Sequence, residues 1–193
     1  NDQKRVNRLR GQALAIRGLV HFDLLRYWGV SYERQSTALG IPYKSTANQE
    51  EMPARLTVKE TYDKIFADLK EAETLLADTD KAINSGTSRA YLDQLAVKAL
   101  LARVSLYAKD YAAAEEYATA VIDARPLASK AAFADIWKDA AVSEVLWSVS
   151  YSAGQGSPSN SLYYAPNNRN GYRPAATLEA LYDQVNDIRG PAY

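Results

Sequence analysis

The side chains best suited to recognising a ligand are concentrated between residues 155 and 173, a stretch rich in tyrosine and asparagine. A sugar needs a flat aromatic wall for the C–H face of its ring and polar groups for its hydroxyls. We therefore predict a glycan-binding surface made of Tyr163, Tyr164, Tyr172, Asn160, Asn167, Asn168 and Arg169. The alternative interpretation is an ordinary surface turn, in which asparagine and glycine support backbone with positive φ.

A second set of candidate binding residues follows an N-terminal helical stretch. Trp28 is followed by Tyr32 and Arg34, so a large aromatic ring lies close in sequence to a phenol and a guanidinium. The alternative is that Trp28 packs against its own helix end, as large aromatic residues commonly do. The composition agrees with a role in recognition, because 14 tyrosines and 3 tryptophans outnumber 3 phenylalanines and rings with a polar edge suit half-wet positions.

The residues needed for catalysis are poorly represented. Cysteine is absent, and the one histidine, His21, lies in a helical stretch where no spacing suggests a nucleophile beside it. The sequence has no HExxH zinc motif, no phosphate-binding Walker loop and no GxGxxG element that opens a helix. We therefore expect a non-enzymatic protein with no catalytic residues, no cofactor and no metal. An enzyme with dispersed acidic residues is the alternative, although no carboxylate pair stands out.

The charge balance argues against nucleic acid as a partner. The 23 basic and 23 acidic residues cancel, which leaves no surplus of positive charge to neutralise phosphates or to dock on an anionic membrane. No apolar run approaches the roughly 20 residues that span a bilayer, and the N-terminal stretch lacks the apolar core of a signal peptide. The sequence predicts either a soluble intracellular protein or one whose leader is not part of this chain.

The helices that position these candidate residues are predicted from the periodicity of apolar residues. Apolar residues at steps of three and four predict four main helices, over 5–28, 57–77, 90–108 and 111–124. Thr57 and Glu60 form a capping box at the start of the second helix, and Pro126 ends the fourth. The other predicted segments are an extended connection over 30–56, a short helix or turn over 131–137, a strand over 144–151, a loop over 152–172 and a helix over 175–185.

The same periodicity predicts which side chains face the core. For the first helix the predicted inward stripe is Val6, Leu9, Ala13, Ile16, Val20, Leu24 and Tyr27. For the third helix it is Leu95, Ala99, Leu100, Ala102, Leu106 and Tyr107.

The third and fourth helices match the tetratricopeptide pattern. Small residues mark the close approach of the two helices, an aromatic residue opens the second one and proline closes the repeat; these places are held by Ala102, Ala114, Tyr111 and Pro126. Lys109 replaces the usual turn glycine. We expect an all-α, mainly helical fold with tetratricopeptide-like helix pairs, long connecting loops and at most a short strand. The predicted domains are a helical core over 1–151 and a loop-rich segment over 152–193.

The order of the segments resembles the SusD/RagB family of glycan-binding outer-membrane lipoproteins. The family's RAFAYFDLLRLYG helix and following prolyl strand resemble RGLVHFDLLRYWG at 17–29 and GIPY at 40–43. Its next, capped helix resembles KETYDKIFADLKEAETLL at 59–76, ahead of the helix pair. Two later family phrases resemble residues 133–152 and the RPAATLEALYDQVNDIR stretch at 173–189. The ordered set covers nearly the whole chain.

This resemblance implies a function that composition and spacing do not reveal. Members of the family capture oligosaccharide at the cell surface and pass it to a SusC-like, TonB-dependent outer-membrane transporter. They are lipid-anchored in the outer membrane and two to three times as long as this chain, which therefore resembles an internal fragment without the anchor. The alternative function is a tetratricopeptide scaffold that holds a peptide or partner protein in a helical groove.

Overall fold

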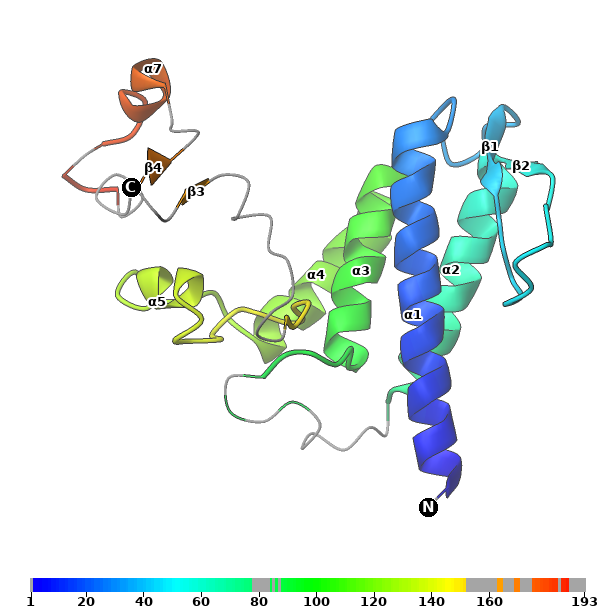
Figure 1. Cartoon of the computed structure of the whole chain (residues 1–193), viewed down its shortest axis with the longest axis horizontal. Coiled ribbons are helices and arrows are strands. Elements are labelled where there is room, and N and C mark those ends of the chain that lie inside the picture. The colour runs from blue at the N-terminus through cyan, green and yellow to red at the C-terminus, as the bar shows by residue number, and fades with distance from the viewer. Residues whose placement is uncertain are drawn as a thin grey trace. The chain divides into compact units, whose positions relative to one another are not determined.

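Figure 1 shows the computed structural model of the chain, which describes residues 2–77, 84, 86, 88–151, 163–164, 169–170, 175–183 and 185–187. Its helices are α1 (Asp2–Trp28), α2 (Val58–Leu75), α3 (Gln94–Tyr107), α4 (Tyr111–Ala124), α5 (Phe133–Trp137) and α7 (Ala176–Glu179). Its strands are β1 (Leu39–Pro42), β2 (Arg55–Thr57), β3 (Tyr163–Tyr164) and β4 (Arg169–Asn170). The predicted mainly helical fold is confirmed.

The chain forms two compact units. The first comprises residues 1–127 and 142–148 and contains α1 to α4 with the antiparallel pair β1–β2. The second comprises residues 128–141 and 149–193 and contains α5, α7 and the antiparallel pair β3–β4. The division into domains at residue 151 stays a prediction.

Local signals set the ends of three main helices. The predicted capping box of α2 is confirmed, since the Thr57 hydroxyl accepts from the Glu60 N–H at 3.2 Å and the Glu60 carboxylate accepts from the Thr57 N–H at 2.8 Å. The bounds of α4 agree with the prediction. In contrast, α3 begins at Gln94 rather than near residue 90, because the Asp93 carboxylate caps it by accepting from the Ala96 N–H at 2.8 Å.

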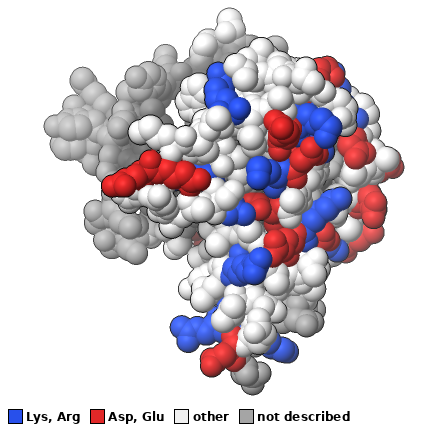
Figure 2. Space-filling view, turned by 90° about the vertical axis from the view of Figure 1, so that its right-hand side faces the viewer, with Lys and Arg blue, Asp and Glu red and all other residues white. Residues whose placement is uncertain are grey.

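Opposite charges alternate on the side of the first unit that carries α2, β1 and β2 (Figure 2). Two ion pairs join α1 to α2, between Arg10 and Glu71 and between Arg17 and Asp68. A second group holds Arg34 and Lys59 around Asp63, and this arrangement lowers the pKa of the Asp63 carboxyl through both hydrogen bonds. Because positive and negative side chains alternate, this face of α2 is polar but has no large patch of a single charge.

The predicted core face of α1 is wrong. The buried residues of this helix are Gly11, Leu14, Ala15, Gly18, His21, Phe22 and Leu25. The predicted stripe lies on the opposite side of the helix, and only Leu24 among its members is partly buried. Periodicity could not choose between the faces, because α1 is apolar on both sides and the buried side includes two glycines and a histidine that score as poor core residues.

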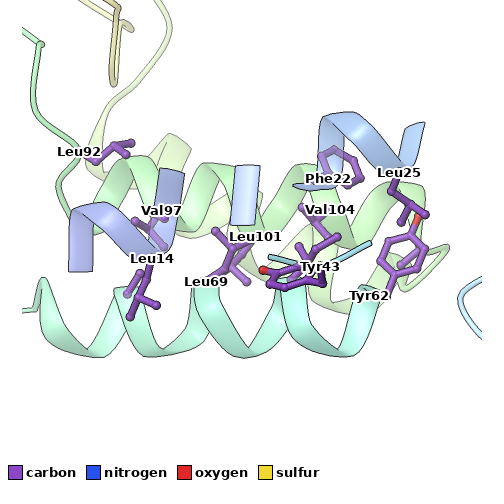
Figure 3. Close-up of a cluster of buried hydrophobic side chains, with 14 of the residues drawn as sticks. Leu14, Phe22, Leu25, Tyr43, Tyr62, Leu69, Leu92, Val97, Leu101 and Val104 are labelled. Carbon is purple, nitrogen blue, oxygen red and sulfur yellow. The ribbon is translucent and has the colours of Figure 1, made fainter. Parts of the chain in front are cut away.

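Side chains from three helices make the core of the first unit (Figure 3). α1 contributes Phe22 and Leu25, and α2 contributes Tyr62, Ile65 and Leu69. α3 contributes Val97, Leu101 and Val104; of its predicted stripe, Leu100 and Tyr107 pack partly buried against this core and Leu106 is exposed. α3 packs on α4 as well as on α2, so it carries apolar residues on more than one side, and the sequence period identified its inner face only in part.

Three other predicted elements differ from the structure. Residues 144–151 form no strand, because the extended segment makes only isolated bonds: the Ser148 N–H donates to Arg89 O at 2.9 Å and Trp147 Nε1 donates to Ala90 O at 3.2 Å. The connection over 30–56 contains β1 and the first two residues of β2. The helix predicted over 175–185 is reduced to α7, which has no side-chain cap at Ala175. β1 lies at the GIPY stretch that resembles the family's prolyl strand, whereas the segment over 144–151 forms none.

A largely buried polar network ties Tyr43, the residue that follows β1, to α1 and α2. Arg17 donates to both Asp68 oxygens at 2.6 and 2.7 Å, and the Tyr43 hydroxyl donates to the same carboxylate at 2.6 Å. Burial and the hydrogen bond to Asp68 raise the pKa of Tyr43. His21 stacks on the Tyr43 ring with centroids 3.9 Å apart. His21 therefore has a packed role in the core.

The hydrogen bonds of His21 fix its protonation. Its Nε2 accepts from the Lys44 N–H at 3.0 Å, and its Nδ1 lies 2.8 Å from Arg17 O, which only an N–H can satisfy. The ring is therefore neutral with the proton on Nδ1. Burial is the largest cause that lowers the pKa of His21, and the positive charge of Arg17 adds to it.

The close approach of α1 and α2 gives a first prediction. A Cβ at Gly18 would lie 3.1 Å from two carbon atoms of Leu69. Gly18→Val should therefore lower the free energy of unfolding, measured in urea, by about 1–3 kcal/mol through overpacking. Ala13→Val, on the exposed side of the same helix, is the matched control and should cost less than about 0.7 kcal/mol. Equal losses from the two substitutions would contradict the α1–α2 contact.

The neutral ring of His21 gives a second prediction. A folded-state pKa below the unfolded one stabilises the protein above the unfolded pKa of about 6.5, and this contribution is lost as the pH falls. His21→Gln should be less stable than the unsubstituted chain at pH 7.5, and the difference in free energy of unfolding should shrink between pH 7 and pH 5. Carboxylates that titrate in both proteins cancel in this comparison. If the difference in free energy of unfolding between the two proteins did not change with pH, the pKa of His21 would be the same in the folded and unfolded states.

Candidate functional site

Most of the first predicted binding surface is not described by the structure. Tyr163 and Tyr164 form β3, and Arg169 lies in β4, where the backbone register places Tyr164 opposite Arg169 and Tyr163 opposite Asn170. Asn160, Asn167, Asn168 and Tyr172 lie outside the described residues. The structure therefore brings two of the predicted tyrosines and the predicted arginine into one antiparallel backbone pair.

The second predicted set contains the end of α1. Trp28 is the last residue of this helix and is 63% exposed, beside the 71% exposed Tyr27. The two rings meet edge to face with centroids 5.6 Å apart. The alternative interpretation, in which Trp28 packs against the helix end, is wrong. A side chain this large in solvent beside another exposed aromatic residue is more informative than scattered surface leucines.

Four aromatic residues lie in contact with Arg26 or with one another at this end of the first unit, two of them around the Arg26 guanidinium. We call the group formed by Arg26, Tyr27, Trp28, Tyr32 and Tyr107 the aromatic cluster. The Arg26 Cζ lies 5.0 Å from the centroid of Tyr107 and 5.7 Å from that of Tyr27. Tyr32 meets Tyr107 edge to face at 6.4 Å. Arg26 also donates to Asp23 at 2.9 Å, so a carboxylate lies within the same group.

Backbone and turn contacts position the cluster. The Tyr32 hydroxyl donates to Arg26 O at 2.8 Å, which ties the loop after α1 to the last turn of the helix. Arg55 donates to Trp28 O at 3.2 Å and to Gly40 O at 2.6 Å, which joins the same helix end to β1. Because these bonds use main-chain oxygens, they hold the segment without covering the aromatic rings.

The turn between α3 and α4 also contacts the loop that carries Tyr32. Lys109 takes the place of the usual tetratricopeptide glycine and has a φ of 60°, a left-handed conformation that costs a non-glycine residue on the order of 1 kcal/mol. Its ammonium forms an ion pair with Glu33, next to Tyr32. Through this pair the turn that follows Tyr107 is joined to the loop that carries Tyr32.

Arg34, the third residue of the second predicted set, is not part of the cluster. Its guanidinium lies 5.6 Å from the Tyr62 ring centroid and 5.4 Å from that of Phe66. It also pairs with Asp63 and donates to Lys59 O. These contacts hold the loop after α1 on the first turns of α2, so the role of Arg34 is to position the loop.

One buried hydroxyl lies within electrostatic range of the cluster. Tyr62 is fully buried, and its hydroxyl has no hydrogen-bond partner among the residues the structure describes. Burial is the main cause that raises the pKa of Tyr62 to about 12, and Tyr32 and Tyr107 contribute in the same direction. Tyr62 points from α2 towards α1 (Figure 3). It therefore belongs to the packing beneath the cluster and not to its exposed surface.

The arrangement is suited to binding and not to group transfer. Aromatic faces, a guanidinium, a carboxylate and a phenol can hold a polar ring-shaped ligand through stacking and hydrogen bonds. His21, the histidine that a general base would require, is buried in the network around Asp68. Across the described part of the chain, no group of three His, Asp or Glu side chains could hold a metal ion. Nor is any described helix both long and apolar enough to cross a membrane.

Sequence reasoning missed three members of the cluster. The helical period predicts inward positions for Tyr27 and Tyr107, and no motif points to Arg26. A usable signal was the spacing of Phe22 and Arg26, four residues apart on one helix face, where the guanidinium lies 5.7 Å from the ring centroid. The pairing with Tyr107 depends on the packing of α3 beside α1, which no local pattern reveals.

Comparison with known proteins places this chain in a family. A family model described as SusD-like, starch-binding and associating with the outer membrane matches residues 1–106. A SusD superfamily protein of Bacteroides thetaiotaomicron VPI-5482 is 31% identical, with a TM-score of 0.60 over 70% of this chain and 29% of its own. A protein of Bacteroides vulgatus ATCC 8482 described as sugar binding is 30% identical, with a TM-score of 0.65 over 79% of this chain and 35% of its own.

The remaining comparisons agree on the fold. A SusD-like carbohydrate-binding protein of Bacteroides vulgatus ATCC 8482 shares the fold at 24% identity, with a TM-score of 0.55 over 66% of this chain and 27% of its own. No curated protein matches the sequence. The chain thus spans about a third of the length of the solved structures it resembles. Because the family model matches more than half of the 193 residues, the chain belongs to the SusD-like family.

Proposed function

We propose that this chain is part of a non-enzymatic carbohydrate-binding protein, and that the aromatic cluster at the end of α1 contacts the sugar. The observation that carries the proposal is the exposure of Tyr27 and Trp28 beside Arg26 in a chain of this family. Exposed aromatic rings leave apolar surface in contact with water, which is unfavourable. A sugar stacked on the rings would remove that surface from water. A function in ligand contact accounts for that cost.

The cluster offers the two kinds of contact that a saccharide requires. Trp28 and Tyr27 present faces and edges for the C–H side of a pyranose ring. Arg26, Asp23 and the phenol of Tyr32 supply donors and acceptors for hydroxyls. The cation–aromatic contacts around Arg26 hold its guanidinium in place, so less side-chain entropy is lost when a ligand binds.

The β3–β4 segment is the second site that we propose. Its register pairs Tyr164 with Arg169, and together with Tyr163, Tyr172, Asn160, Asn167 and Asn168 it provides the same chemistry as the cluster. The two sites belong to different compact units, and the experiment below distinguishes them by substitution in one unit at a time.

We further propose that the protein acts at the bacterial cell surface, anchored by lipid in the outer membrane, and delivers glycan to a SusC-like TonB-dependent transporter. The support is the family's description as associating with the outer membrane. A tetratricopeptide-like scaffold function is the second candidate, and it is favoured by the α3–α4 pair with its buried Ala114. A peptide ligand retained in the absence of any glycan would support the scaffold.

A binding experiment tests the cluster. Calorimetry against a panel of starch, plant and host oligosaccharides should detect binding. Trp28→Ala and Tyr32→Ala should each raise the dissociation constant about fivefold, since one stacked ring contributes on the order of 1 kcal/mol. Tyr91→Ala is the matched control because Tyr91 is exposed to the same degree as Tyr32 and precedes the opposite end of α3, about 20 Å away along the helix.

The outcomes separate the two sites. Unchanged affinity in Trp28→Ala and Tyr32→Ala, with a loss in Tyr163→Ala, Tyr164→Ala or Tyr172→Ala, would move the site to the β3–β4 segment. If no oligosaccharide in the panel bound, carbohydrate binding by this chain would be rejected.

A further inference from the structure

α1 carries a second apolar face that nothing in the described part of the chain covers. We call Val6, Leu9, Ala13, Ile16 and Val20 the outer face. Its four larger side chains are between 45% and 56% exposed, and Ala13 is exposed as well. The residues buried in the core of the first unit, such as Gly18 and Leu25, lie on the other side of the helix.

The spacing of the outer face is that of a helix–helix seam. Its residues are separated by three, four, three and four positions, which is the a and d pattern of a heptad repeat. At 1.5 Å per residue the seam from Val6 to Val20 is about 21 Å long. A helix with apolar residues on two opposite sides normally lies between two partners, and α2 and α3 supply only the inner one.

The flanks of the outer face are basic. Arg5 and Arg8 lie on one side of the seam and Arg10 and Arg17 on the other, given 100° of rotation per residue. Arg10 and Arg17 are paired with Glu71 and Asp68 of α2. Arg5 and Arg8 form no ion pair with any residue that the structure describes. The N-terminal end of α1 projects beyond α2 (Figure 1), and Lys and Arg side chains lie on both sides of this projection in Figure 2.

This charge pattern selects the occupant. α1 has six Lys and Arg residues against two Asp, so a second copy of the helix would bring arginines opposite arginines in either direction. Like charges beside a seam are destabilising, whereas opposite charges at these positions set partner choice. We propose that the outer face of α1 docks an amphipathic helix whose apolar seam is flanked by Glu or Asp. This inference does not depend on carbohydrate binding.

A designed peptide tests the proposal on the full chain. The probe is a fluorescein-labelled 24-residue helix with leucine at the a and d positions and glutamate at the e and g positions. Fluorescence anisotropy should show saturable binding that weakens as salt is raised. A peptide with lysine at the e and g positions should bind at least tenfold more weakly.

Substitutions locate the docking surface. Ile16→Glu and Val20→Glu should each weaken acidic-peptide binding at least tenfold without changing the circular dichroism spectrum, because both side chains are already half exposed. Ile122→Glu on α4, which replaces an apolar residue of similar exposure, is the matched control and should leave binding unchanged.

Three results would overturn the proposal. The first is that the acidic peptide does not bind when the protein is present at about 100 µM. The second is that the lysine peptide binds with the same affinity as the acidic peptide. The third is that Ile122→Glu and Val20→Glu weaken acidic-peptide binding equally. Sedimentation equilibrium supplies the remaining test: a dimer that Val20→Glu abolishes would assign the outer face to a second copy of the chain.

Discussion

The Arg17–Asp68 ion pair is the contact on which the arrangement of the first unit depends. Half-buried ion pairs bring little net stability, because desolvation offsets most of the attraction, but removing one partner leaves an uncompensated charge and is costly. Here the carboxylate accepts three hydrogen bonds, two from Arg17 and one from Tyr43. The pair therefore specifies one arrangement of α1, α2 and β1 and excludes others in which these groups would be unpaired.

The consequences of this arrangement reach the aromatic cluster through the backbone. With β1 held against α1 and α2, the loop before it can cap α2: Ala38 O accepts from the Val58 N–H at 2.9 Å and Ser36 O accepts from the Lys59 N–H at 3.0 Å. These bonds satisfy donors that a helix start leaves free. They also fix the loop that carries Tyr32 beside Arg26. A polar network in the middle of the helices thus determines which aromatic side chains meet at their end.

The sequence predicted those features that depend on neighbours along the chain. The capping box at Thr57 and the stop of α4 before Pro126 need only a few adjacent residues, and both are present. The core face of α1 could not be predicted, because its inner side uses Gly11 and Gly18 for a close approach to α2, and such residues carry no hydrophobic signal. Likewise, the residues next to Trp28 in the sequence identify it as a candidate. The position of Tyr107 in the same cluster depends on contact between α1 and α3, which are far apart in the sequence. Local pattern therefore determined these element ends but not the inner face of α1.

The two faces of α1 also explain how one helix can serve two purposes without conflict. Continuing the seam beyond Val20 by three residues reaches Asp23, a charged position that pairs with Arg26. A carboxylate in a seam is unfavourable for apolar packing, so the continuous apolar strip ends there, one turn before Tyr27 and Trp28. The aromatic rings consequently lie beyond the strip at the end of the same rigid helix. Burial of the outer face would then order α1 along its length while leaving the rings at its end accessible to a ligand.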